Sequence, residues 1–108
     1  MKDRWTKSSL SLSQQRLIQL LQSINFGTIE NLIVRDGEPV FDPSPRVIRD
    51  IKLGGENGPR PELASADFVL REPVIELFRH LREIGNGTVA SLQVRHGLPF
   101  KLEVEQPA

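Results

Sequence analysis

The chain has 108 residues, 38% of them hydrophobic and 26% charged, which suits one compact globular domain. Lys plus Arg equals Asp plus Glu at 14 each, so no gross positive charge favours nucleic acid or an anionic membrane. Zero cysteines exclude a disulfide framework and thiol chemistry, and no apolar run predicts a membrane span or a signal peptide, so we expect a cytoplasmic protein without a membrane partner.

Two segments of the chain repeat each other at an offset of 60 residues. GTIENLIVRDGEP, residues 27–39, and GTVASLQVRHGLP, residues 87–99, are identical at seven of 13 positions. Self-similarity on this scale indicates a repeated supersecondary unit. We expect a single domain over 1–108 with three parts, namely a first αββ repeat at 12–42, a connecting strand and Pro/Gly-rich loop at 43–71, and a second αββ repeat at 72–105.

Each repeat begins with an amphipathic helix. Ser13 is the expected N-cap of the first helix, and Pro73 suits the first turn of the second. Asn25 and Gly85 follow the helices at equivalent positions and are residue types that close a helix in the left-handed conformation. Apolar residues recur in steps of three and four in both helices, at Leu17, Leu20, Leu21 and Ile24, and at Val74, Leu77, Phe78, Leu81 and Ile84.

A hairpin follows each helix, and its register depends on the length of the turn. In the second repeat, a three-residue loop that ends at Gly97 places Val94 opposite Leu98 and Leu92 opposite Phe100. A two-residue turn mixes apolar and polar residues on both faces. Because burial of one face constrains register strongly, we predict the three-residue loop, with positive φ at its final glycine in both hairpins.

The first hairpin has apolar residues on both faces in this register. Leu32 and Val34 lie on the buried face, whereas Ile29, Ile33 and Phe41 point the other way. A second apolar face needs a cover, and Ile29, Ile33 and Phe41 are therefore the candidate protein interface. The cover is either the connecting strand or a second subunit.

The connecting segment contains the expected third strand. Residues 46–53 alternate apolar and polar side chains, which is typical of a strand, and prolines precede them. The whole pattern predicts an α+β fold in which two αββ repeats share one antiparallel sheet. Both helices are expected on one face and a pseudo-twofold axis between the halves, because each unit alone is too small to bury its apolar face.

The repeat resembles a small bacterial family, a domain of unknown function, whose members run helix, G-[ST]-V strand, [DN]-G turn, strand and short basic tail strand. The resemblance covers about one repeat; the second repeat departs from it at His96 and has no tail strand. It implies the helix-plus-hairpin fold and bacterial origin, and it brings no assigned activity. The matching residues are Ile24, Gly27, Thr28, Ile29, Val34, Asp36, Gly37 and Val40, with 46–53 as the looser match to the tail.

No arrangement of residues indicates catalysis. The nucleotide-binding, metalloprotease, EF-hand and nucleophile-elbow spacings are absent from the sequence. His80 and His96 are the only histidines, and their positions favour a helix-paired residue and a turn residue over a metal ligand or a base. We therefore predict no catalytic residue, no metal and no cofactor.

Two functions remain. The one we favour is a non-enzymatic protein-interaction or homodimerisation module, whose partner is itself or another protein. The alternative is a nucleic-acid-binding regulator that uses the hairpin tips and a helix. The candidate basic surface for that alternative consists of Arg35, Arg95, Arg79 and Arg82.

Overall fold

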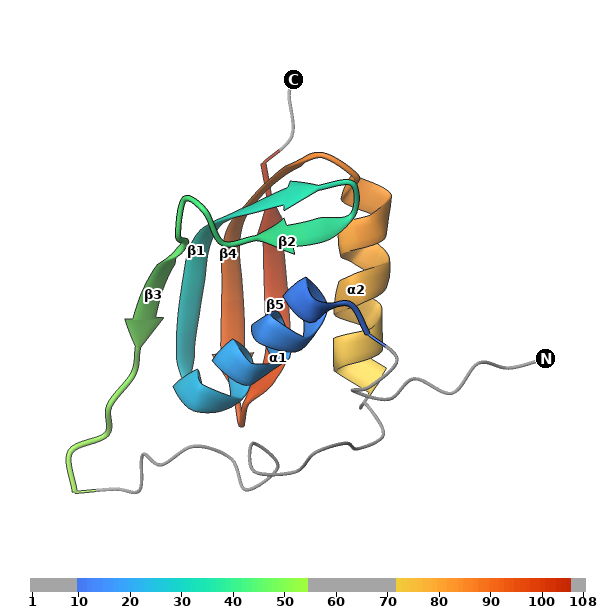
Figure 1. The fold of residues 1–108 in the computed structure, drawn as a ribbon. Helices are drawn as coiled ribbons and strands as arrows, with labels where there is room; N and C mark the ends of the chain where they lie inside the picture. Colours follow the sequence, from blue (N-terminus) through green and yellow to red (C-terminus); the bar gives the residue numbers. More distant parts are fainter. Residues whose placement is uncertain (1–9, 55–71, 106–108) are drawn as a thin grey trace.

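The computed structural model describes residues 10–54 and 72–105, which form two helices and a five-stranded antiparallel sheet (Figure 1). The α+β class predicted from the sequence is confirmed. In chain order the elements are α1 (Leu12–Ile24), β1 (Gly27–Arg35), β2 (Glu38–Val40), β3 (Arg46–Arg49), α2 (Glu72–Ile84), β4 (Gly87–Arg95) and β5 (Leu98–Val104).

The sheet has the order β2-β1-β4-β5, and β3 also pairs with β1. Since β4 occupies one edge of β1, the strands β2 and β3 share the other edge, where β3 pairs with residues 27–30 and β2 with residues 33–35. The expected third strand is thus confirmed for residues 46–49. It extends the sheet sideways, so it does not cover a face of the first hairpin.

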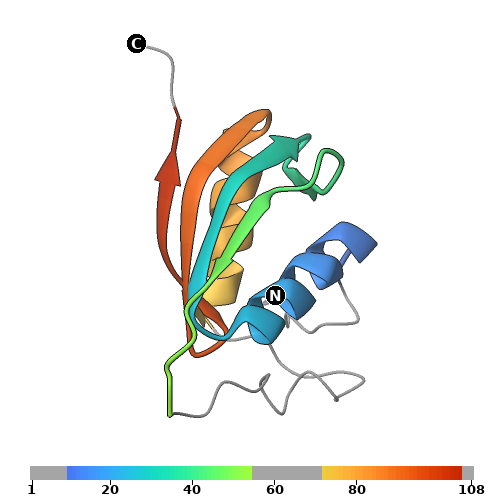
Figure 2. The same ribbon diagram turned by 90° about the vertical axis from the view of Figure 1, so that its left-hand side faces the viewer.

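Both helices pack against the same face of the sheet (Figure 2). Their apolar stripes meet the inward residues of the two central strands, which alternate with outward polar residues. One cluster of buried residues therefore contains side chains from both halves of the chain. Its members are Leu10, Leu17, Ile18, Leu21, Ile24, Ile29, Leu32, Val34, Val74, Leu77, Phe78, Leu81, Val89, Leu92 and Val94.

The helix ends follow from capping chemistry, with one correction. The N-cap of α1 is Ser11, whose hydroxyl accepts from the Gln14 N–H at 3.2 Å while the Gln14 side chain accepts from the Ser11 N–H at 3.1 Å. The expected cap, Ser13, lies inside the helix, because the capping box forms two residues earlier, between Ser11 and Gln14. Asn25 and Gly85 both have positive φ, 64° and 69°, as predicted. Asn25 has ψ of −58°, and the Phe26 N–H donates to the Ile24 carbonyl at 2.7 Å, so α1 ends in a γ-turn and not in the left-handed helical conformation.

The three-residue loop predicted for the hairpins is wrong. Arg95 pairs with Leu98 in the second hairpin, and Arg35 pairs with Glu38 in the first, so each turn has two residues. All four turn residues have positive φ, between 52° and 76°, as a type I′ turn requires. Positive φ at both glycines is confirmed, but the register from which it was predicted is wrong.

A β-bulge restores the apolar pattern that the two-residue turn disturbs. Val94 pairs with Pro99 and Gln93 with Lys101, so Phe100 is an additional residue in β5. Beyond it, Leu102 lies opposite the buried Leu92. A prediction that assumes regular alternation from the turn cannot reach this arrangement.

Ile29 belongs to the core, which corrects its predicted orientation. It is fully buried together with Leu32 and Val34, although Leu32 is three positions further along the strand and regular alternation would place the two on opposite faces. Asn31, with φ of 59°, lies between them, and this left-handed residue shifts the alternation of the strand. Ile29 therefore cannot form part of an exposed interface.

Candidate functional site

The tip of each hairpin is hydrogen-bonded to the helix end of the other half of the chain. The Gly37 N–H donates to the Gly85 carbonyl at 2.8 Å, and the Gly97 N–H donates to the Asn25 carbonyl at 2.9 Å. Because β1 and β4 run antiparallel, the two tips lie at opposite ends of the sheet. Groups on the two tips therefore cannot contact one small ligand together.

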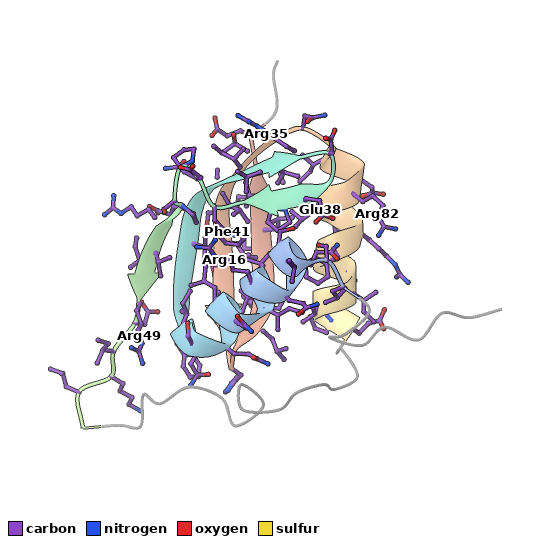
Figure 3. All side chains as sticks on the ribbon, viewed as in Figure 1. Arg16, Arg35, Glu38, Phe41, Arg49 and Arg82 are labelled. Atoms are coloured by element: carbon purple, nitrogen blue, oxygen red, sulfur yellow. The ribbon has the colours of Figure 1, made fainter. Side chains whose placement is uncertain are left out.

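The four arginines of the candidate basic surface are divided by this arrangement. The turn after Arg35 packs against Arg82 near the end of α2 (Figure 3). Arg95 lies at the other end of the sheet, roughly 25–30 Å away along the strands. Arg79 forms an exposed ion pair with Glu72 at 3.9 Å, which contributes little to stability. The structure brings Arg35 and Arg82 to one end and leaves Arg95 apart.

The three residues of the candidate protein interface lie in three different environments. Ile29 is buried in the core, and Ile33 is partly buried on the open face, where it pairs with Thr88. Phe41 packs against the core beside α1, with the Arg16 guanidinium 4.6 Å from the centre of its ring (Figure 3). These residues do not form one surface.

Exposed apolar side chains lie on β3, at one border of the sheet. Val47 is 43% exposed and Ile48 is 37% exposed. The Asp50 N–H donates to the Phe26 carbonyl at 2.8 Å, so by alternation the backbone groups of Val47 point away from β1. Arg46 forms an ion pair with Glu30 of the neighbouring strand at 3.7 Å, on the open face of the sheet.

The opposite border of the sheet is β5, and it exposes the largest apolar side chain of the two borders. Phe100 is 57% exposed, and the Arg95 guanidinium lies 4.1 Å from the centre of its ring. Among the described residues no strand pairs with the outer edge of β5. The sequence predicted Phe100 to be buried, and only the bulge places it at this border.

A groove accompanies each border on the helix side. The groove between α2 and β5 has a volume of about 390 Å³. The groove between α1 and the connection from β2 to β3 has a volume of about 450 Å³, and Phe41 of the connection and Val47 of β3 are among its lining residues. The lining of the groove between α2 and β5 consists of Pro73, Glu76, Leu77, His80, Leu92, Pro99, Phe100, Lys101, Leu102 and Val104.

Both histidines contact neighbouring side chains. His80 lies 3.2 Å from Glu83 on α2, and the ring of His96 meets the ring of Phe26 edge to face at 4.8 Å between centres. Within residues 10–54 and 72–105, no three His, Cys, Asp or Glu side chains gather into a group that could hold a metal ion.

In the part of the chain that the structure describes, neither helix is long and apolar enough to span a membrane. The chain matches no family model, no curated protein and no solved structure.

Proposed function

We propose that this protein is a non-enzymatic interaction module whose partner is a second copy of itself. The observation that carries the proposal is that, within the described residues, no strand pairs with the outer edge of β5 or of β3, and both strands carry exposed apolar side chains, Phe100 on β5 and Val47 and Ile48 on β3. An open edge offers a row of backbone donors and acceptors to another strand. Apolar residues beside it provide the burial that strand addition requires.

A nucleic-acid-binding function has less support. The four arginines do not gather into one basic patch, because the hairpin tips that carry Arg35 and Arg95 lie at opposite ends of the sheet. The formal net charge of zero adds no long-range attraction. We keep this alternative as an outcome of the test below.

The proposal includes an origin of the fold as two diverged copies related by a pseudo-twofold axis. The two helices have 13 residues each and begin 60 residues apart. The pairs Gly27 with Val94 and Val34 with Gly87 exchange with each other under the same offset, as do the two hydrogen bonds that hold the hairpin tips. This correspondence supports duplication, and it leaves the two borders as the places where the halves differ.

Light scattering of the purified full chain tests the proposed function. We expect a mass of twice 12.2 kDa at micromolar concentration, falling toward 12.2 kDa on dilution. A mass of 12.2 kDa at every concentration contradicts the proposal. An increase that occurs only when a DNA duplex is added contradicts it as well, in favour of the nucleic-acid alternative.

The variant Ile33→Glu tests whether the open face of the sheet mediates self-association. Ile33 is partly buried on that face, away from the outer edges of β3 and β5. If association uses a border, the variant keeps the dimeric mass. A folded monomeric Ile33→Glu protein beside a dimeric wild type assigns the interface to the face and removes the border from the proposal.

A further inference from the structure

We infer that the second copy binds along the outer edge of β5, and that the two β5 strands pair antiparallel in one register centred on Leu102. This inference rests on the proposed function and specifies its surface. The strand β5 has seven residues, whereas β3 has four and directly follows Pro45, which has no N–H to donate. The β5 edge therefore offers the longer ladder of hydrogen bonds.

The backbone of β5 determines which residues can bond to a partner strand. The Glu105 N–H donates inward to the Thr88 carbonyl at 3.2 Å. Because successive residues of a strand point to opposite edges, Leu102 and Val104 direct their N–H and C=O groups outward. A twofold axis perpendicular to the sheet then pairs these even-numbered positions, and Leu102 lies opposite the partner's Leu102, the partner's Phe100 or the partner's Val104.

Charge selects one of these three registers. When Leu102 lies opposite the partner's Leu102, Lys101 lies opposite the partner's Glu103, and the twofold axis repeats this ion pair. When Leu102 lies opposite the partner's Phe100, Lys101 lies opposite the partner's Lys101. When Leu102 lies opposite the partner's Val104, Glu103 lies opposite the partner's Glu103. Like charges directly opposite each other destabilise a strand pair, so only the register centred on Leu102 is favourable.

Lys101 and Glu103 have no charged neighbour across the ladder with β4 that would compete with an ion pair to the partner. Lys101 and Glu103 are exposed, and their partners across the ladder with β4 are the neutral residues Gln93 and Ser91. In the inferred register they occupy non-hydrogen-bonded positions, where opposite Cα atoms approach to about 4.5 Å. The two ion pairs would therefore form without breaking an ion pair to β4.

The helix side of the same register joins apolar groups. Leu102, which shares its face with the buried Leu92, comes to lie opposite the partner's Leu102, and the bulge residue Phe100 comes next to the partner's Val104. Next to Val104 is a hollow of about 190 Å³, lined also by His80, Glu83 and Ile84, which can receive the partner's Phe100. Pairing would thus cover the apolar ring that the single chain leaves 57% exposed.

Charge exchange at the two positions tests the inference. Lys101→Glu places carboxylates opposite carboxylates, and Glu103→Lys places ammonium groups opposite ammonium groups. We expect each single variant to raise the dissociation constant of the dimer about tenfold or more, because two attractions become two repulsions. The double variant Lys101→Glu/Glu103→Lys has the composition of the wild type and restores both pairs, so it should dimerise like the wild type.

Mixing the two single variants gives a sharper result. A chain with Glu at both positions and a chain with Lys at both positions form two attractive pairs, so the mixture should recover the dimeric mass that neither variant has alone. Light scattering measures each mass, and circular dichroism verifies that each variant is folded. A mixture that stays monomeric, or a double variant that stays monomeric, overturns the inferred register.

The outcomes also separate this inference from the proposed function. If the wild type is dimeric and the single variants remain equally dimeric, the β5 interface is wrong and self-association through another surface stands. If the wild type is monomeric at every concentration, the proposed function itself fails. Because Lys101 and Glu103 are both exposed, these substitutions leave the packing of the core unchanged, and the measured mass reports on association alone.

Discussion

Gly37 is constrained by its backbone conformation and by its contact with α2 at the same time. Its φ is +76°, in the region where a side chain is strained. A Cβ atom added to it would lie 3.1 Å from the Cα of Arg82, and backbone at that position cannot rotate away as a side chain can. Glycine is therefore required at this turn for two separate reasons.

The variants Gly37→Ala and Gly85→Ala separate these two reasons. Gly85 has φ of +69°, but an added Cβ would meet no atom within 4 Å. We expect Gly85→Ala to lower the free energy of unfolding by about 1 kcal/mol, from backbone strain alone. Gly37→Ala should cost about 2 kcal/mol or more, because the contact with Arg82 adds overpacking. Equal losses in urea denaturation would show that the hairpin tip moves away from α2.

At the scale of elements, α1 is connected to β2 through its first turn. Glu38 of β2 accepts hydrogen bonds at 2.5 Å from the hydroxyls of Ser11 and Ser13. Ser11 also caps the helix through the Gln14 N–H, whereas Ser13 caps nothing. Both serines therefore donate to Glu38, but only Ser11 caps the helix.

This difference predicts unequal effects of removing each hydroxyl. Ser11→Ala should lower the free energy of unfolding by about 1 kcal/mol, because it leaves N–H groups of the first turn without their capping acceptor. Ser13→Ala should change it by about 0.5 kcal/mol or less, since Glu38 keeps one hydroxyl partner and the site is near the surface. Thermal denaturation of the two variants gives both values. A larger loss for Ser13→Ala would transfer the capping role to that residue.

For the whole molecule, the central fact is that one cluster of buried residues contains side chains of both halves. Leu81 of α2 is fully buried in this cluster, whereas Leu12 of α1 is 84% exposed. A large-to-small change at Leu81 therefore opens a cavity that both halves line. The same change at Leu12 removes surface that is already in water.

We accordingly expect Leu81→Ala to lower the free energy of unfolding by about 2–5 kcal/mol and to melt the chain in a single transition. Leu12→Ala should alter it by about 0.5 kcal/mol or less. Calorimetry together with circular dichroism measures both. Two separate transitions in the Leu81→Ala protein would mean that the halves unfold independently.

The sequence by itself determined the elements, because each depends on neighbours along the chain. The three- and four-residue steps of apolar residues predicted both helices, and Asn25 and Gly85 marked the positions of positive φ at their ends. The Asp-Gly and His-Gly turns located the hairpins, and alternation located the strand at 46–49. The α+β class followed from the order of these elements.

Only the tertiary structure decided the phase of the strands and the surface that remains exposed. A left-handed residue at Asn31 and a bulge at Phe100 each shift the alternation, so Ile29 is buried and Phe100 is exposed, the reverse of their predicted positions. Regular alternation carries no information about such shifts, because the packing of helices and neighbouring strands selects them. These two shifts are the reason why the proposed interface lies at the edge of β5 and not on the face of the first hairpin, where the sequence predicted it.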